Sequence, residues 1–102
     1  PLRNDHPGHE IAASQMQGGF GAMLSFEVEG DYARTKQVAE STKLFQLAVS
    51  LGAVESLIEH PGRMTHASAA GSPLEVPADL VRLSVGIEDV EDLVTDLDKA
   101  LR

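Results

Sequence analysis

The sequence has 102 residues, which suits one small domain and leaves too little chain for two independent cores. Sixteen acidic residues against eight basic ones give a net charge of −8, which argues against a nucleic acid or a membrane as partner, because both favour a basic surface. The sequence contains no cysteine, so disulfides, thiolate metal sites and cysteine nucleophiles are excluded.

The first nine residues are polar and contain Pro1, Pro7 and Gly8, which predicts a lead-in or the end of a linker. The sequence does not begin with Met, so we expect a processed chain or a piece of a longer one. Its apolar stretches are far shorter than the ~20 residues needed to cross a bilayer, and the start has no secretory signal pattern.

The first half of the chain predicts a helix, a strand and a second helix. Residues 9–17 suit a short helix, which the Gly18-Gly19-Phe20-Gly21 run interrupts. Alternating apolar positions predict a half-buried strand over residues 22–28, with one face formed by Ala22, Leu24, Phe26 and Val28. Asp31 is a candidate N-cap for a helix over residues 31–49, whose apolar stripe consists of Val38, Leu44, Phe45 and Ala48.

The second half predicts a short strand over residues 53–58, a turn at His60-Pro61-Gly62 and an irregular crossing over residues 63–78. A clearer strand follows over residues 80–85, with Val81, Leu83 and Val85 on one face and Leu80, Arg82 and Ser84 on the other. The last helix has the most regular apolar spacing, at Val90, Leu93, Val94, Leu97 and Leu101. This order of elements predicts an α+β fold, with a small, mostly antiparallel sheet and helices packed on one face.

Three groups of residues invite a functional interpretation, and each has a structural explanation that we favour. The glycine cluster precedes a strand instead of following one, which indicates flexible entry to that strand and not a phosphate loop. The histidines lack the helical spacing of a zinc hydrolase, so we expect surface or loop hydrogen bonding from His6, His9, His60 and His66. A solvated helix start explains the acidic run of Glu88, Asp89, Glu91 and Asp92.

Arg82 is the charge whose position needs an explanation. It lies in the middle of a predicted strand, where a charged side chain is costly unless it has a partner or faces a cleft. Its planar guanidinium suits bidentate binding of a carboxylate. An ion pair with an acidic residue of the same domain explains Arg82 equally well, so the residues alone leave both interpretations open.

Three longer runs carry a resemblance to a known family. They are LAVSLGAVESLIEHP over residues 47–61, MTHAS over residues 64–68 and LVRLSVGIEDVEDL over residues 80–93. Together, and in this order, they resemble the C-terminal domain of the pyridoxal-phosphate-dependent enzymes of cysteine and methionine metabolism. That family includes cystathionine γ-synthase, cystathionine γ-lyase, methionine γ-lyase and the O-acylhomoserine sulfhydrylases.

The resemblance implies that residues 1–102 are the small, C-terminal domain of a fold-type I enzyme. The larger domain, which is absent from this chain, would bind most of the pyridoxal phosphate (PLP) and carry the Schiff-base lysine. The whole enzyme would be a lyase or transferase that performs γ-elimination or γ-replacement on a sulfur amino acid, with the cofactor as electron sink. The resemblance also implies a cytoplasmic homotetramer with no metal, whereas the 102-residue chain alone should be inactive.

The same resemblance assigns roles to four residues. Arg82 matches the arginine that binds the substrate α-carboxylate, and Thr65 matches a position near the substrate. Ser50 matches a position lining the site beside the cofactor lysine, where it could also contact the cofactor. Val49 stands where members that handle cystathionine usually have Glu, and it matches the pattern of methionine γ-lyase and the sulfhydrylases. We expect methionine γ-lyase by a slight preference, with cystathionine γ-synthase, cystathionine γ-lyase and O-acylhomoserine sulfhydrylase as alternatives.

Two other functions remain as alternatives. The chain could be an inactive stand-alone domain that binds a carboxylate ligand, or that pairs with an intact homologue. It could also be an unrelated α+β module in which Arg82 forms a structural ion pair, although the three matching runs argue against that.

Overall fold

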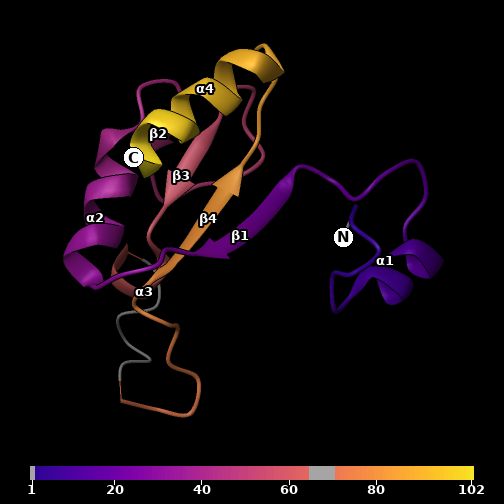
Figure 1. Cartoon of the computed structure of the whole chain (residues 1–102), viewed down its shortest axis with the longest axis horizontal. Coiled ribbons are helices and arrows are strands. Elements are labelled where there is room, and N and C mark those ends of the chain that lie inside the picture. The colour runs from indigo at the N-terminus through magenta and orange to yellow at the C-terminus, as the bar shows by residue number, and fades with distance from the viewer. Residues whose placement is uncertain (1, 65–70) are drawn as a thin grey trace.

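The computed structural model describes residues 2–64 and 71–102, and within these ranges the chain forms four helices and a four-stranded sheet, with the first helix lying apart from the sheet (Figure 1). In chain order the elements are α1 (His9–Gln15), β1 (Met23–Glu27), α2 (Tyr32–Ser41), β2 (Gln46–Leu47), β3 (Leu57–Glu59), α3 (Pro61–Met64), β4 (Leu80–Ser84) and α4 (Val90–Leu101).

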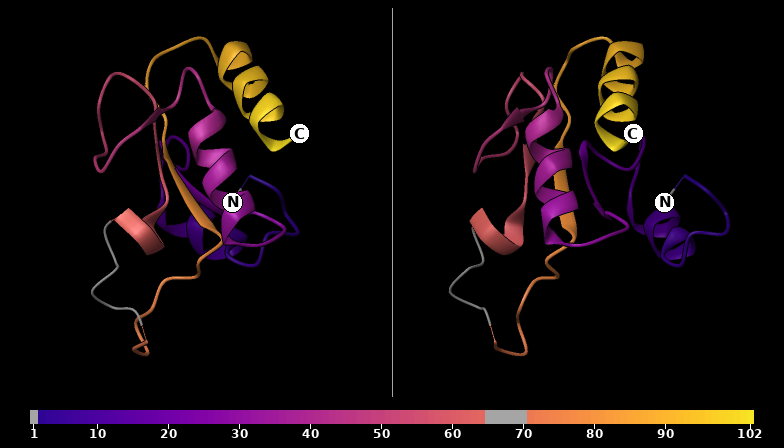
Figure 2. Two further views of the ribbon diagram at one scale, coloured as in Figure 1. Left: turned by 90° about the vertical axis from the view of Figure 1, so that its left-hand side faces the viewer. Right: turned by 60° about the vertical axis from the view of Figure 1, so that its left-hand side comes forward.

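The sheet has the strand order β1-β4-β3-β2. β4 pairs antiparallel with both β1 and β3, whereas β2 pairs parallel with β3. α2 and α4 lie on the same side of the sheet, and the loop between β2 and β3 lies on the other side (Figure 2). The predicted α+β fold, with a mostly antiparallel sheet and helices on one face, is therefore confirmed, and β2 is an added parallel strand.

The hydrophobic core lies between the sheet and these two helices. Val81 and Leu83 of β4 are 0 % and 1 % exposed, as the alternation of that strand predicts. The rest of the buried cluster comes from both helices, the neighbouring strands and the loops, and comprises Val28, Val38, Ala39, Phe45, Ile58, Leu93 and Ala100. Because the odd-numbered side chains of β4 are buried here, Arg82 and Ser84 point to the opposite face of the sheet.

The prediction of one helix over residues 31–49 is wrong, because α2 ends at Ser41. Thr42 is extended, and the carboxylate of Asp96 on α4 accepts hydrogen bonds from the next three backbone N–H groups, those of residues 43, 44 and 45, at 2.8, 2.8 and 3.1 Å. Those donors therefore need no helical acceptor, and the chain can continue into β2. Burial disfavours the charged carboxylate, but the three N–H groups together with Lys43 hold the pKa of Asp96 below its usual value.

Three further boundaries differ from the prediction. α1 ends at Gln15 and buries no residue. The strand predicted over residues 53–58 is displaced to β3, which includes Glu59. Pro61 begins the short helix α3 instead of a turn, since a proline is well suited to the first helical position. Residues 71–79 contain neither helix nor strand, in agreement with the predicted irregular crossing.

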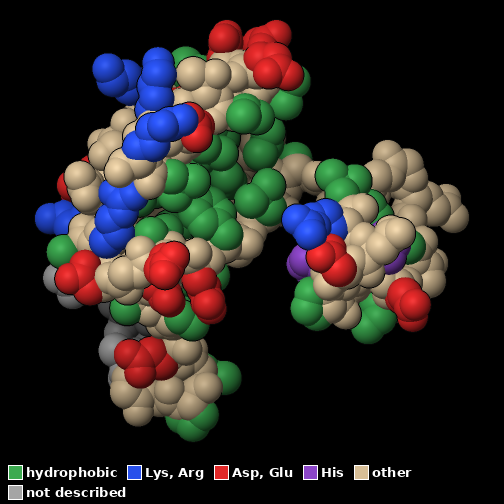
Figure 3. Space-filling view, viewed as in Figure 1, with side chains coloured by type: hydrophobic (Ala, Val, Ile, Leu, Met, Phe, Trp, Pro, Cys, Tyr) green, Lys and Arg blue, Asp and Glu red, His purple; other side chains and the backbone are tan. Residues whose placement is uncertain are grey.

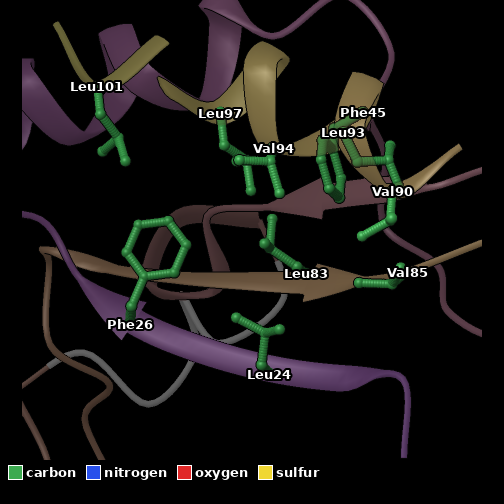
Figure 4. A pocket seen from close by; sticks show the side chains of 10 residues that line it. All are labelled: Leu24, Phe26, Phe45, Leu83, Val85, Val90, Leu93, Val94, Leu97 and Leu101. Atoms are coloured by element: carbon green, nitrogen blue, oxygen red, sulfur yellow. The ribbon is translucent and has the colours of Figure 1, made fainter. Parts of the chain in front are cut away.

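The predicted final helix is confirmed as α4, and its N-cap Asp89 accepts hydrogen bonds from the N–H groups of Glu91 and Asp92. Its apolar stripe, however, is only partly buried, because Val90, Val94 and Leu101 are 65 %, 56 % and 44 % exposed. These side chains line a groove of about 380 Å³ together with Leu24 and Phe26 of β1 (Figure 4). The groove is visible as a hydrophobic hollow between α4 and β1 (Figure 3).

Candidate functional site

The candidate site lies on the sheet face opposite the two long helices, where β4 presents Arg82. In the strand register Arg82 stands opposite Ser25 of β1 on one side and opposite Glu59 of β3 on the other. Directly opposed residues of antiparallel strands project to the same face. The fold therefore brings an acidic side chain next to Arg82 from a strand more than twenty residues earlier in the sequence.

Arg82 and Glu59 form an ion pair in which the Nη2 and Oε2 atoms are 2.5 Å apart. The two side chains differ greatly in burial, since that of Glu59 is 1 % exposed and that of Arg82 is 24 % exposed. The intradomain ion pair that the sequence left open is therefore present. It does not enclose the arginine, because about a quarter of the Arg82 side chain still faces solvent.

A second anchor comes from the loop between β2 and β3, residues 48–56, which we call the 48–56 loop. The backbone oxygen of Ser50 accepts a hydrogen bond of 3.0 Å from Nη2 of Arg82. This bond places Ser50 and its neighbour Val49 beside the guanidinium, with the Val49 side chain 58 % exposed. The loop thus forms one wall of the site and presents an apolar side chain at its edge.

The 48–56 loop is held in place by the end of β4 and the residues that follow it. Ser84 Oγ accepts from the N–H of Gly52 at 2.8 Å, and the N–H of Ile87 donates to the carbonyl of Val54 at 2.9 Å. These bonds cross from one segment to the other beside Arg82. The position of Ser50 therefore depends on the same segment that carries the arginine.

Ser56 and Glu88 complete this connection. Ser56 Oγ accepts from the N–H of Gly86 at 2.8 Å and donates to Glu88 Oε2 at 2.7 Å, while Glu88 Oε1 accepts from the N–H of Ser56 at 2.8 Å. The hydroxyl of Ser56, followed by its N–H, lowers the pKa of Glu88 below its usual value. The prediction of a solvated helix start is thus wrong for Glu88, whereas Asp89, Glu91 and Asp92 are exposed as expected.

The structure brings together three of the four residues that the sequence singled out. Arg82 is bonded to the backbone of Ser50, Val49 precedes Ser50 in the same loop, and Thr65 lies outside the described residues. Sequence analysis missed Glu59, because the strand was predicted to end one residue before it. The available signal was the Leu57-Ile58-Glu59 run directly before Pro61, since a charge next to two buried strand residues needs a partner.

The glycine cluster and the histidines, which the sequence also singled out, have the following places in the structure. Gly18, Gly19 and Gly21 have φ values of 74°, 131° and 81°, which agrees with their predicted role as flexible entry to the strand. His6 accepts a hydrogen bond from a backbone N–H in the exposed lead-in. His60 is buried, and its Nε2 lies 2.5 Å from the carbonyl oxygen of Ala78 in the segment before β4, in agreement with the expected loop hydrogen bonding. His66 lies outside the described residues.

Two further features are absent from residues 2–64 and 71–102. No group of three or more histidine and carboxylate side chains there could hold a metal ion. No helix there is long and apolar enough to span a membrane.

Comparisons with known proteins place this geometry in a family. The family model described as "Cys/Met metabolism PLP-dependent enzyme" matches residues 1–102. The chain belongs to this family. Its resemblance to the C-terminal domain of these enzymes, which rested on three sequence runs, is therefore confirmed at the level of the family.

Three relatives illustrate the similarity. The cystathionine gamma-synthase of Mycobacterium tuberculosis H37Rv is 62 % identical over 96 residues, which is 94 % of this chain and 24 % of the relative. The L-methionine gamma-lyase of Fusobacterium nucleatum subsp. polymorphum is 50 % identical over 104 aligned positions, covering 99 % of this chain and 26 % of that enzyme. The crystal structure of metB from Corynebacterium glutamicum superposes with a TM-score of 0.89 at 58 % identity, covering 97 % of this chain and 26 % of the other. This chain therefore spans about a quarter of the length of its relatives.

Family members depend on PLP, so we asked whether the described residues could hold that cofactor. A PLP site needs a lysine for the Schiff base and groups that bind the phosphate. The three lysines of the sequence are Lys36 on α2, Lys43 in the turn after it and Lys99 on α4, all associated with the helical side of the sheet and not with Arg82. The described residues therefore do not form a PLP site by themselves.

Proposed function

We propose that this chain is the small, C-terminal domain of a PLP-dependent enzyme that performs γ-elimination or γ-replacement on a sulfur amino acid. In this proposal Arg82 binds the α-carboxylate of the substrate. The observation that carries it is the partial use of the guanidinium, since Nη2 contacts Glu59 and Ser50 while no described residue accepts a hydrogen bond from Nε or Nη1. These donors belong to a side chain that is 24 % exposed, so a carboxylate from solvent can reach it.

The chemical task of Arg82 is orientation. A charge-assisted hydrogen bond from Nε or Nη1 fixes the position of a carboxylate and limits the directions open to the neighbouring Cα–H bond. Ser50 and Val49 would line the same side of the substrate, because the Ser50 carbonyl is bonded to the guanidinium itself. This role needs no proton transfer by residues of the chain, which agrees with the expectation that no catalytic residue lies within it.

The similarity to named relatives favours γ-replacement of the cystathionine γ-synthase type. Four mycobacterial relatives of that name are 60–62 % identical to this chain, compared with 50 % for the methionine γ-lyases of Fusobacterium nucleatum. The second candidate is methionine γ-lyase, which the sequence favoured. Its support is the exposed apolar side chain of Val49 beside Ser50, which suits a thioether better than a distal ammonium group.

The remaining features of the enzyme are proposed on the same basis. The Schiff-base lysine and the phosphate-binding groups would lie in a larger domain outside these 102 residues, and Ser50 could contact the cofactor from this side. We also propose a cytoplasmic homotetramer. The 102-residue chain alone is expected to lack lyase and transferase activity, which can be assayed directly on the purified chain.

The test of Arg82 uses the full-length enzyme that contains this domain. Arg82→Ala should lower kcat/KM by roughly 10–10²-fold, because a hydrogen bond to a charged group contributes about 1.5–3 kcal/mol and the substrate carboxylate loses one. Arg102→Ala is the matched control, since Arg102 also forms an ion pair, with Asp98 on the exposed end of α4. Equal values of kcat/KM for Arg82→Ala and the control would show that Arg82 does not bind the substrate. A substrate panel of methionine, cystathionine, and O-acylhomoserine with cysteine then separates the two reactions.

A further inference from the structure

The carboxylate of Glu59 is an unexpected neighbour for an anion-binding arginine. Its side chain is 1 % exposed, and neither oxygen has a hydrogen-bond donor with regular alignment among the described residues. Its contact with Nη2 of Arg82 is an ion pair at 2.5 Å. A site built only for the strongest attraction of anions would not have a buried negative charge directly beside its cation. Glu59 therefore needs a function other than attraction.

The contacts of the guanidinium suggest that function. Glu59 and the carbonyl of Ser50 both lie on Nη2, one from β3 and the other from the 48–56 loop. The guanidinium is planar, so an ion-paired carboxylate and a hydrogen-bonded carbonyl at one nitrogen restrict both its position and its rotation. The remaining N–H groups on Nε and Nη1 then point in fixed directions, and one of them can meet a carboxylate without the entropy cost of ordering a free arginine.

We propose that Glu59 is a positioning residue, which holds Arg82 so that one of its remaining N–H groups, on Nε or Nη1, binds the substrate carboxylate. This inference rests on the proposed role of Arg82 and adds a residue that acts through it. Glu59 lies directly opposite Arg82 in the pairing of β3 with β4, and its side chain is too buried to contact substrate itself. Its importance lies in the oxygen that it places against Nη2, so glutamine, which keeps an oxygen of the same shape without the charge, should replace much of the contact.

The experiment measures competitive inhibition of the full-length holoenzyme by norvaline and by its amide, norvalinamide. Norvaline lacks a leaving group at the γ-carbon, and the amide lacks the carboxylate charge that Arg82 would bind. Glu59→Met fills a similar volume without an acceptor and should raise the inhibition constant of norvaline roughly 10²-fold, the cost of a misplacement near 1 Å. The inhibition constant of norvalinamide should change less than threefold. Glu59→Gln keeps an acceptor and should restore norvaline inhibition to within about tenfold of the wild type.

Glu27→Gln is the matched control. Glu27 lies on β1, two residues from Ser25 and thus on the same sheet face as Arg82, and it is exposed. Removing its charge should leave both inhibition constants unchanged. If Glu59→Met yields no soluble holoenzyme, Glu59→Asp withdraws the carboxylate by one methylene group and should weaken norvaline inhibition selectively in the same way.

Three results would overturn the inference. They are unchanged inhibition by norvaline in Glu59→Met, equal weakening of both inhibitors, and tighter norvaline binding in either variant, which would mean that Glu59 opposes the ligand. Arg82→Ala is measured in parallel, so that a failure of the proposed function can be distinguished. If Arg82→Ala leaves the norvaline-to-norvalinamide ratio unchanged, the role of Arg82 itself is wrong. If Arg82→Ala changes this ratio but the Glu59 variants do not, the role of Arg82 stands and only the role proposed for Glu59 is wrong.

Discussion

Gly86 occupies the closest approach between the segment after β4 and the 48–56 loop. A Cβ atom at this position would lie 2.1 Å from the carbonyl oxygen of Val54 and 2.7 and 2.8 Å from backbone atoms of Glu55 and Ser56. Non-bonded carbon atoms normally stay about 3.5–4.0 Å apart. Gly86→Ala therefore forces the two backbones apart by about 1 Å, and no rotation of a side chain relieves the clash because all three atoms belong to the main chain.

The displacement acts on both stability and the site. It breaks or lengthens the bonds from Ile87 N to the Val54 carbonyl and from Gly86 N to Ser56 Oγ, each contributing about 1 kcal/mol. Added to an overpacking cost of about 1–3 kcal/mol, the expected destabilisation is about 3–5 kcal/mol. The moved loop also carries the Ser50 carbonyl away from Arg82, so the KM for substrate should rise about tenfold or more.

Hydrogen exchange and steady-state kinetics on the full-length enzyme test this prediction. Gly86→Ala should speed exchange in peptides covering residues 50–56 and raise KM. The control is Gly52→Ala, in the same loop, where φ is +75° and no atom lies within 4 Å of an added Cβ. That variant carries only the left-handed backbone cost of about 1–2 kcal/mol. If Gly86→Ala perturbs exchange and KM no more than Gly52→Ala, the steric argument is refuted.

Two further predictions concern other parts of the chain. Asp96→Asn should lower the free energy of unfolding by about 1–2 kcal/mol at pH 7, because one of the two acceptor oxygens is lost from the N–H groups that follow Thr42. Since the folded pKa of Asp96 is depressed, this contribution is full above the unfolded pKa of about 3.9 and is lost as the pH falls through the folded value. Urea unfolding should therefore show a difference between wild type and variant at pH 7 that shrinks at pH 2, and a constant difference would contradict the assignment. Val49→Glu should shift the kcat/KM ratio of cystathionine to methionine about fivefold towards cystathionine, the equivalent of an exposed ion pair of about 1 kcal/mol, and an unchanged ratio would exclude Val49 as a specificity residue.

The sequence predicted the elements whose pattern is local. The alternation of β4 and the apolar spacing of α4 identify an inward face from neighbouring residues alone, and β1, β4 and α4 lie within two residues of their predicted bounds. The prediction that β1 is half-buried is wrong, because none of its five residues is buried. The end of α2 could not be predicted in this way, because its cause is Asp96, more than fifty residues further along the chain. Val38 and Phe45 fit one helical pattern of apolar residues because both are buried in the same core. Val38 lies on α2, however, whereas Phe45 lies in the segment after that helix.

The site shows the same division between local and long-range information. Arg82 was recognised because a charge in a strand is unusual by itself. Its partner Glu59 depends on the register between β3 and β4, and its bond to Ser50 depends on the path of the 48–56 loop. Neither contact can be predicted from the spacing of residues in the sequence. Glu88 was missed for the related reason that an acidic residue before a helix already has a sufficient local explanation.

The bond between Arg82 and Ser50 uses the main-chain oxygen of residue 50 and not its side chain. Replacing Ser50 or Val49 by another residue therefore leaves this anchor in place, whereas inserting or deleting a residue in the 48–56 loop would bring a different carbonyl to the guanidinium. Amino-acid identity and loop length are thus under separate constraints at this edge of the site. New side chains can be tried beside a fixed arginine, which lets substrate preference diverge without rebuilding the part of the site that holds the carboxylate.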